Sequence, residues 1–91
     1  MAKIQVSHIL VDKEYEAQDI LRALNEGKSF EDLARKYSKC PSAQQGGDLG
    51  LIDSQRLDET FEDAALALKA GETTKKPVRT RFGYHLIKRV K

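Results

Sequence analysis

The 91-residue sequence lacks several features that mark secreted or membrane proteins. It has a single cysteine, Cys40, so no internal disulfide can form, which fits a reducing compartment. No apolar run approaches the roughly 18 residues that span a bilayer. The first residues also lack the apolar core and cleavage site of a secretory signal. We therefore expect a cytoplasmic protein with no membrane segment, unless the chain is part of a longer exported one.

Metal ligands and nucleophiles are equally sparse. One cysteine and two distant histidines, His8 and His85, provide no pair of zinc ligands at the usual short spacing. Cys40 and a histidine would make a nucleophilic pair, but no cysteine-protease signature surrounds Cys40 and no helix is expected to begin directly after it. The stretch QQGGDLG, residues 44–50, lacks the Gly-Lys-Ser/Thr ending of a phosphate loop. We expect no metal and no cofactor.

Acidic residues are missing from the end of the chain. Residues 73–91 carry seven Lys or Arg and no Asp or Glu, whereas residues 1–72 carry nine Lys or Arg and all fourteen acids. A basic end of this kind suits contact with nucleic acid or an acidic partner. The alternative is a solvated pair of strands whose lysines discourage edge pairing. We favour the solvated strands over nucleic-acid contact, because no aromatic-rich stacking surface accompanies the basic residues.

The sequence does contain the pattern of a folded domain. At 40% hydrophobic and 33% charged residues, its composition is that of a globular rather than a disordered protein, and we expect residues 1–91 to form one domain. Alternation over residues 3–11 predicts a strand with Ile4, Val6, His8 and Leu10 on one face. A large apolar excess is absent, so the default expectation is a monomer.

Three stretches place apolar residues at helical spacing. The first is stopped by Gly27, the second begins with Ser29 as N-cap, and the third begins at Asp58 and is stopped by Gly71. The expected buried stripes are Ala17, Ile20, Leu21 and Leu24; then Phe30, Leu33, Ala34 and Tyr37; then Phe61, Ala64, Ala65 and Leu68.

Further short strands are expected at residues 49–52, 75–80 and 84–90, with a turn at RFG joining the last two. This order predicts an α+β domain with a small, antiparallel sheet covered by helices. Both histidines then fall within strands, where a hydrogen-bonded core role is commonest. If the first and last strands pair, His8 and His85 can lie side by side, and burial with mutual repulsion would keep at least one neutral. Gly46 and Gly47 are expected to turn the chain into the strand at Leu49 through positive φ.

Four motifs together resemble the parvulin family of peptidyl-prolyl cis–trans isomerases. They are VSHILV (6–11), SKCPSAQQGGDLG (38–50), TFEDAALALKAGE (60–72) and FGYHLIK (82–88), in the family's order and spacing. The resemblance implies a four-stranded antiparallel sheet surrounded by helices, in the order β-α-α-β-α-β-β. It also implies rotation about the bond before proline in peptides and unfolded protein clients, which assists protein folding.

The resemblance assigns roles to particular positions. His8 and His85 match two family histidines that lie close together at the floor of the site. Cys40 matches a position where the family has cysteine or aspartate facing the substrate amide, and this interchange argues against an obligatory covalent step. Thr80 matches a threonine of the histidine network. The proline pocket matches Leu49, Leu57 and Phe61 as walls and Phe82 as rim.

Some positions depart from the family pattern. Leu57 stands where many members have methionine, and Ile52 where many have an aromatic residue, which leaves a non-catalytic binding module as an alternative function. Phosphate-directed members carry a basic cluster after the first strand, whereas VDKEYEAQD, residues 11–19, is short and acidic. A phosphate dianion would be repelled there. We predict an isomerase that does not require phosphate and that accepts apolar or basic residues before proline.

Overall fold

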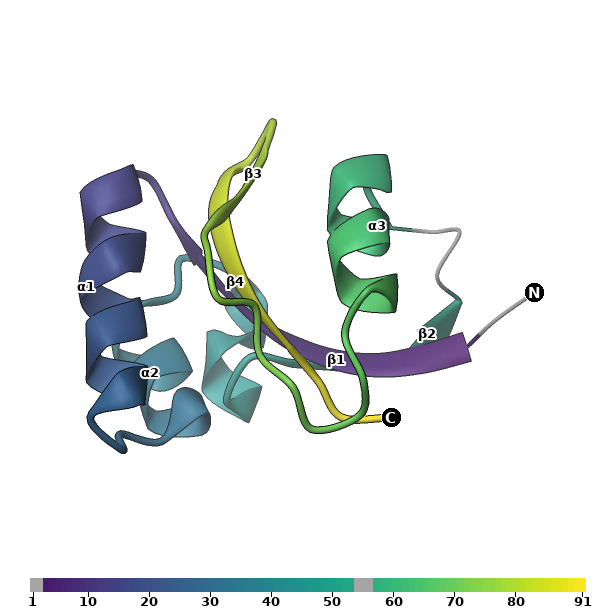
Figure 1. Cartoon of the computed structure of the whole chain (residues 1–91), viewed down its shortest axis with the longest axis horizontal. Coiled ribbons are helices and arrows are strands. Elements are labelled where there is room, and N and C mark those ends of the chain that lie inside the picture. The colour runs from purple at the N-terminus through teal and green to yellow at the C-terminus, as the bar shows by residue number, and fades with distance from the viewer. Residues whose placement is uncertain (1–2, 54–56) are drawn as a thin grey trace.

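A four-stranded antiparallel sheet, with strand order β2-β1-β4-β3, forms the centre of the computed structural model, which describes residues 3–53 and 57–91 (Figure 1). The elements, in chain order, are β1 (Lys3–Val11), α1 (Glu14–Asn25), α2 (Phe30–Tyr37), the 3₁₀ helix η1 (Pro41–Gln45), β2 (Asp48–Asp53), α3 (Glu59–Leu66), β3 (Val78–Thr80) and β4 (Gly83–Arg89). This confirms the predicted α+β class and its order of strands and helices.

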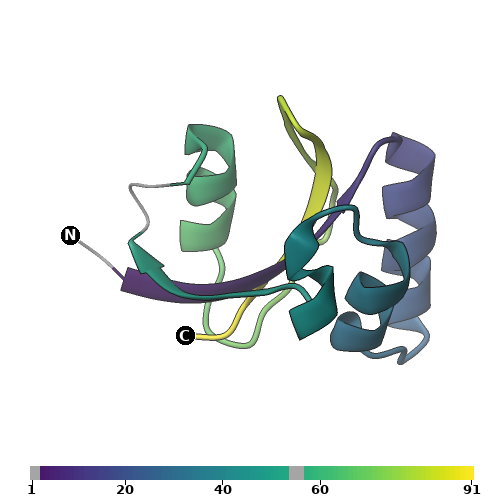
Figure 2. The same cartoon turned by 180° about the vertical axis from the view of Figure 1, so that it is seen from behind.

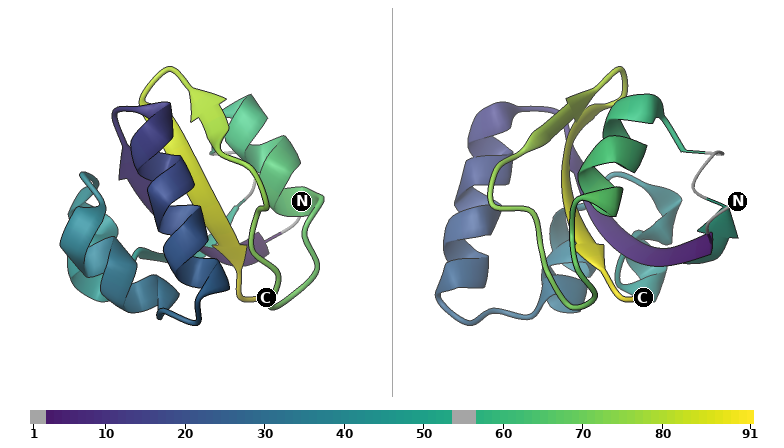
Figure 3. Two further views of the ribbon diagram at one scale, coloured as in Figure 1. Left: turned by 60° about the vertical axis from the view of Figure 1, so that its left-hand side comes forward. Right: turned by 45° about the vertical axis from the view of Figure 1, so that its right-hand side comes forward.

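Helices cover both faces of the sheet, and each face has its own apolar core. Figures 1 and 3 show α1 and α2 on one side of β1 and β4, and α3 on the other. On the first face, Ile9, Val11 and Leu86 pack with residues of α1 and α2. On the second, Ile4, Val6 and Ile87 pack with Phe61 and Ala65 of α3. Both faces are buried because β1 alternates between these two cores.

The central pairing is between the first and last strands. β1 and β4 are antiparallel, with His8 opposite Ile87 and Leu10 opposite His85. Residues directly opposite each other project to the same face of a sheet, so this register puts both histidines on the α3 face. Figure 2, the view from behind, shows η1 next to α2, with α3 on the opposite side of the molecule.

The predicted helix starts and the first stop are present. Ser29 caps α2 by accepting a hydrogen bond from the Asp32 N–H (3.3 Å), and Asp58 caps α3 by accepting one from the Thr60 N–H (3.0 Å). Gly27 takes a positive φ of 96° just after α1. The local sequence therefore controls where these helices begin and where the first one ends.

Three local expectations were wrong. α3 ends at Leu66 rather than near Gly71, because β4 binds the chain beyond it: Arg89 donates to the Leu68 carbonyl (2.8 Å), and the Gly71 N–H donates to the Arg89 carbonyl (2.6 Å). Tyr37 is 44% exposed, since it is the last residue of α2. A short 3₁₀ helix does begin directly after Cys40, started by Pro41.

In the described part of the chain, no helix is long and apolar enough to cross a membrane.

Candidate active site

A buried pair of histidines forms the floor of the candidate site. His8 Nδ1 lies 3.0 Å from His85 Nδ1, and the two rings are stacked with their centroids 5.2 Å apart. Seventy-seven positions separate the pair in sequence, and the β1–β4 register brings them together. Both side chains are buried, with 5% and 4% of their surface exposed. The structure thus places side by side the two histidines that the sequence predicted as neighbours.

The hydrogen bond between the two rings requires that at least one of them is neutral. One Nδ1 must donate to the other, and two protonated imidazoles would leave both Nδ1 atoms as donors. Burial lowers the pKa of His8 to about 4, with a further contribution from repulsion by His85. Burial also lowers the pKa of His85, although the carboxylate of Asp58 acts in the opposite direction. The floor of the site is therefore uncharged at neutral pH.

Thr80 fixes one end of the pair. Its Oγ1 lies 2.7 Å from His85 Nε2 and accepts a hydrogen bond from the Phe82 N–H (3.2 Å). Both nitrogens of His85 are thus engaged. His8 Nε2 is buried and has no hydrogen-bond partner within residues 3–53 and 57–91. The aromatic ring of Phe61 meets both imidazoles edge-on, with centroids 5.5 Å from His8 and 5.1 Å from His85.

Above this floor lies a mostly apolar cleft with a volume of about 300 Å³. Its lining comprises His8, Cys40, Leu49, Leu57, Asp58, Phe61, Phe82 and His85. Seven of the eight residues predicted from the sequence line the cleft. The eighth, Thr80, does not line it but is hydrogen-bonded to His85. A cleft of this size and lining can hold an apolar ring such as that of proline.

A glycine pair sets the position of the Cys40 loop against β1. The Gly47 carbonyl accepts a hydrogen bond from the His8 N–H (2.9 Å), and Gly46 and Gly47 have positive φ values of 70° and 87°. A Cβ atom on Gly47 would lie 2.4 Å from the His8 carbonyl oxygen. Only glycine allows this approach, which fixes η1 beside β1 and brings Cys40 and Leu49 to the same cleft.

One lining residue was assigned only a structural role in the sequence. Asp58 was predicted to cap α3, and it does so, but it also borders the cleft beside Leu57. Its position directly after a predicted pocket residue and three before Phe61 was the signal that could have revealed it. Ile52, which departs from the family pattern, does not line the cleft; it pairs with Ile4 and packs against the core of Ile4 and Val6.

The arrangement of His, Cys, Asp and Glu side chains bears on what the cleft can hold. Among the described residues, no three His, Cys, Asp or Glu side chains gather as metal ligands. The cleft supplies instead one thiol, one carboxylate and a neutral histidine pair around an apolar space. These groups suit binding and desolvation of a peptide segment.

Comparison with known proteins gives consistent matches over nearly the whole chain. Residues 8–91 match the family model described as Rotamase: PPIC-type PPIASE domain. The chain is 48% identical over 88 residues to the foldase protein PrsA of Bacillus subtilis, covering 96% of this chain and 30% of that one. It is 46% identical over 93 residues to the putative peptidyl-prolyl cis-trans isomerase Cbf2 of Campylobacter jejuni, with 94% and 34% covered.

Solved structures agree with the sequence matches. The crystal structure of PrsA from Bacillus subtilis has a TM-score of 0.93 at 47% identity, covering 98% of this chain and 35% of that one. The solution structure of NmPin, the parvulin of Nitrosopumilus maritimus, has a TM-score of 0.86 at 41% identity, with 100% and 98% covered. The chain spans about a third of the length of the curated relatives it matches.

Proposed function

The chain belongs to the PpiC-type peptidyl-prolyl cis–trans isomerase family, and we propose that it isomerises Xaa-Pro bonds of peptides and unfolded proteins in the cleft above His8 and His85. The observation that carries this proposal is the geometry of that cleft: apolar walls from β2, from α3 and the residue Leu57 before it, and from the turn between β3 and β4, over an uncharged, hydrogen-bonded floor. By easing a slow step in folding, the activity would assist the folding of client proteins.

The reaction needs no bond to be broken. Rotation about a peptide bond faces a barrier of about 18–20 kcal/mol, which makes Xaa-Pro isomerisation take tens to hundreds of seconds. A ~10⁴-fold acceleration requires a barrier lower by about 5.5 kcal/mol. In the planar amide, resonance separates charge between oxygen and nitrogen, and twisting removes that separation. A site that removes water from the amide therefore favours the twisted state over the planar one.

The apolar walls would supply this desolvation. Leu49 and Leu57 would enclose the proline ring with Phe61, while Phe82, which is 58% exposed, would cover it from the rim. Because the histidine pair is neutral, it adds no charge that would stabilise the polar planar amide. Its hydrogen bonds to Thr80 and its ring contacts with Phe61 would hold the floor rigid.

Cys40 would act without forming a covalent adduct. It lies at the edge of the cleft on the loop before η1, where its thiol would face the carbonyl side of the substrate amide. A polar group in this place would restrain the amide oxygen while the proline ring turns. Thr80, His8 and His85 complete the polar network.

A protease-coupled assay tests the proposal directly. The cis-to-trans conversion of tetrapeptides with apolar, basic or acidic residues before proline would be measured with the purified chain. Acceleration that is lost on substitution of Phe61 by alanine, while the fold is retained by circular dichroism, supports isomerisation in this cleft. Binding of the same peptides without acceleration would favour the second candidate, a non-catalytic module that holds unfolded chains.

We also propose that the chain works as a monomer in the cytoplasm. The support is the lone Cys40, which has no second cysteine to pair with, and the small number of large apolar side chains that are exposed in the described structure. Sedimentation velocity tests the monomer, and cell fractionation tests the location. Nucleic-acid binding by the basic end is the disfavoured alternative, and salt-dependent retention on DNA would test it. Lys88 of this region pairs with Glu31 at 3.5 Å.

A further inference from the structure

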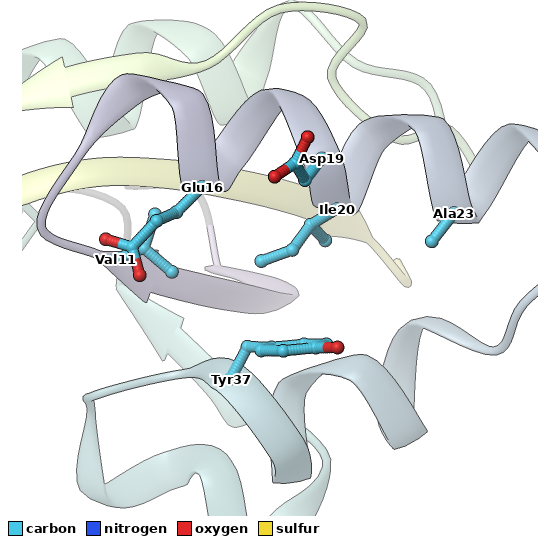
Figure 4. Close-up of a pocket in the computed structure, with 6 residues that line it drawn as sticks. All are labelled: Val11, Glu16, Asp19, Ile20, Ala23 and Tyr37. Carbon is cyan, nitrogen blue, oxygen red and sulfur yellow. The ribbon is translucent and has the colours of Figure 1, made fainter.

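A second cleft lies on the opposite face of the sheet from the proposed active site. It has a volume of about 250 Å³ and lies between α1 and the end of α2. Six residues line it: Val11, Glu16, Asp19, Ile20, Ala23 and Tyr37 (Figure 4). None of them contributes to the cleft above the histidine pair, so this space has no part in the proposed isomerisation.

The body of the second cleft is apolar and has one aromatic wall. Figure 4 shows the ring of Tyr37 on edge, with Ile20 directed toward it from α1 and Ala23 further along the same helix. Val11 and Ile20 are buried, whereas Tyr37 is 44% exposed. The Tyr37 hydroxyl forms no hydrogen bond with the described residues. An exposed aromatic face opposite an aliphatic helix surface fits a long, flat side chain.

The charge at the cleft is negative. Glu16 and Asp19 line it, and within the described structure no basic side chain does. Glu16 uses Oε1 to accept a hydrogen bond from the Lys13 N–H (3.1 Å) and has no ion-pair partner in that part of the chain. The nearby Lys39 is instead held by Asp12. Asp19 pairs at 3.2 Å with Arg22, but both side chains are largely exposed, so this pair is weak.

The aromatic wall attracts cations. Lys36 Nζ lies 5.2 Å from the centroid of the Tyr37 ring, so a lysine of this chain already uses the ring. Lys36 does not line the cleft. Glu16 lines the same cleft as the ring, so a cation that stacks on the ring from within the cleft would share this space with the carboxylate. A guanidinium group suits both contacts, because it is planar, stacks on aromatic faces and donates to carboxylates in a fork.

We propose that this cleft binds an arginine side chain of a basic polypeptide segment. The aliphatic part of the arginine lies between Ile20, Ala23 and the Tyr37 ring, and its guanidinium group meets Glu16 at the rim. The site gives the chain a second contact for basic polypeptides on the face of the sheet away from the histidine pair. This inference does not rest on the isomerase activity.

The test uses a peptide without proline, so that the cleft above His8 and His85 is not engaged. Acetyl-Ala-Arg-Ala-amide would be titrated into the ¹⁵N- and ¹³C-labelled chain and followed by NMR, with the citrulline analogue as a neutral control of the same shape. We expect weak binding, with a Kd on the order of millimolar, because a single side chain provides the contacts. Saturating shifts at Ile20, Ala23 and Tyr37, weakened by added salt, are expected for arginine only.

Matched variants separate the cleft from general surface charge. Glu16→Gln keeps the acceptor for the Lys13 N–H, since glutamine also completes a capping box, and should raise Kd about 3-fold. Tyr37→Leu keeps apolar packing but removes the aromatic face, with an effect of about 3-fold as well. Glu14→Gln and Tyr15→Leu, at exposed positions on α1 outside the cleft, should change Kd little.

Three results would overturn the proposal. The first is equal binding of the arginine and citrulline peptides, which would mean that charge is not recognised. The second is a set of shifts spread over the exposed acids of α1 without saturation in the cleft. The third is an equal loss of affinity in the control variants. None of these results bears on Xaa-Pro isomerisation, which the coupled assay measures separately.

Discussion

At the scale of single residues, Cys40 separates a covalent from a non-covalent mechanism. It lines the cleft that also contains the histidine pair. If the thiol acts only as a polar group facing the amide, aspartate can replace it. We expect Cys40→Asp to retain substantial kcat/KM and Cys40→Ala to lose more, by about 10-fold. The measurement is the protease-coupled assay with one tetrapeptide.

The opposite pattern would revive a nucleophilic step. It would consist of inactive Cys40→Ser and Cys40→Asp variants together with an alkylation-sensitive adduct between enzyme and substrate, detected by mass spectrometry. The fold of each variant would be checked by its unfolding midpoint, because Cys40 is the residue just before η1.

The histidine pair links stability to pH. The pKa of His8 is lowered to about 4 in the folded chain, against about 6.5 when unfolded. Between these values the unfolded chain binds the extra proton, so stability is complete above pH 6.5 and is lost as pH falls toward 4. Each pKa unit corresponds to about 1.4 kcal/mol, so we expect a loss of up to about 3 kcal/mol from His8. The lowered pKa of His85 acts in the same direction.

Urea unfolding at pH 7, 5.5 and 4.5 measures this effect, and NMR titration of the imidazole signals tests its source. An imidazole of His8 that titrates near pH 6.5 in the folded chain would contradict the prediction. Removing either ring, as in His8→Ala or His85→Ala, should lower both stability and turnover, because the partner would lose its buried hydrogen bond.

At the scale of elements, the contact between the Cys40 loop and β1 depends on Gly47. In Gly47→Ala, the new methyl group would lie 2.4 Å from the His8 carbonyl oxygen at a φ of +87°. We expect a loss of at least about 2 kcal/mol, since the left-handed conformation alone costs about 1–2 kcal/mol and the clash adds to it. Turnover should fall too, because the loop that carries Cys40 must move away from His8.

Gly50→Ala is the matched control for this contact. Gly50 also has a positive φ, of +74°, but nothing lies within 4 Å of a Cβ placed there. The loss of stability in Gly50→Ala should be limited to the cost of placing alanine in the left-handed backbone conformation. Equal destabilisation of the two variants in urea unfolding would show that the close approach at His8 contributes nothing.

At the scale of the whole molecule, the distribution of charge predicts substrate preference. The segment from β1 into α1 is acidic, with Asp12, Glu14, Glu16 and Asp19, and Lys39 beside it is already paired with Asp12. This segment therefore offers no basic cluster that would bind a phosphate dianion before proline. We expect kcat/KM for a phospho-Ser-Pro peptide to be no higher than for its Ser-Pro counterpart in the coupled assay.

A large preference for the phosphorylated peptide would contradict this prediction. Arg81 would then be the first candidate for binding the phosphate. Its guanidinium group lies 5.1 Å from the ring centroid of Phe82, at the rim of the cleft. Comparing both peptides at low and high salt separates such an attraction from binding of the proline ring, because salt screens exposed charges.

The sequence by itself determined the local elements and the family of this protein. Helix caps at Ser29 and Asp58 and the glycine stop at Gly27 act through neighbouring backbone groups, so a short stretch of sequence is enough to predict them. The resemblance carried by the four ordered motifs likewise assigned seven of the eight residues that line the cleft. Neither of these results depends on how distant strands pair.

Only the tertiary structure decided what depends on register and on neighbouring elements. The 3.0 Å contact between His8 and His85 exists because β1 and β4 pair with His85 opposite Leu10. α3 ends at Leu66, before the predicted stop at Gly71, because Arg89 binds the chain beyond it. The second cleft arises where Tyr37 at the end of α2 meets Ile20 of α1. Such features join residues far apart in sequence, and their geometry is fixed only when the whole sheet and its helices pack together.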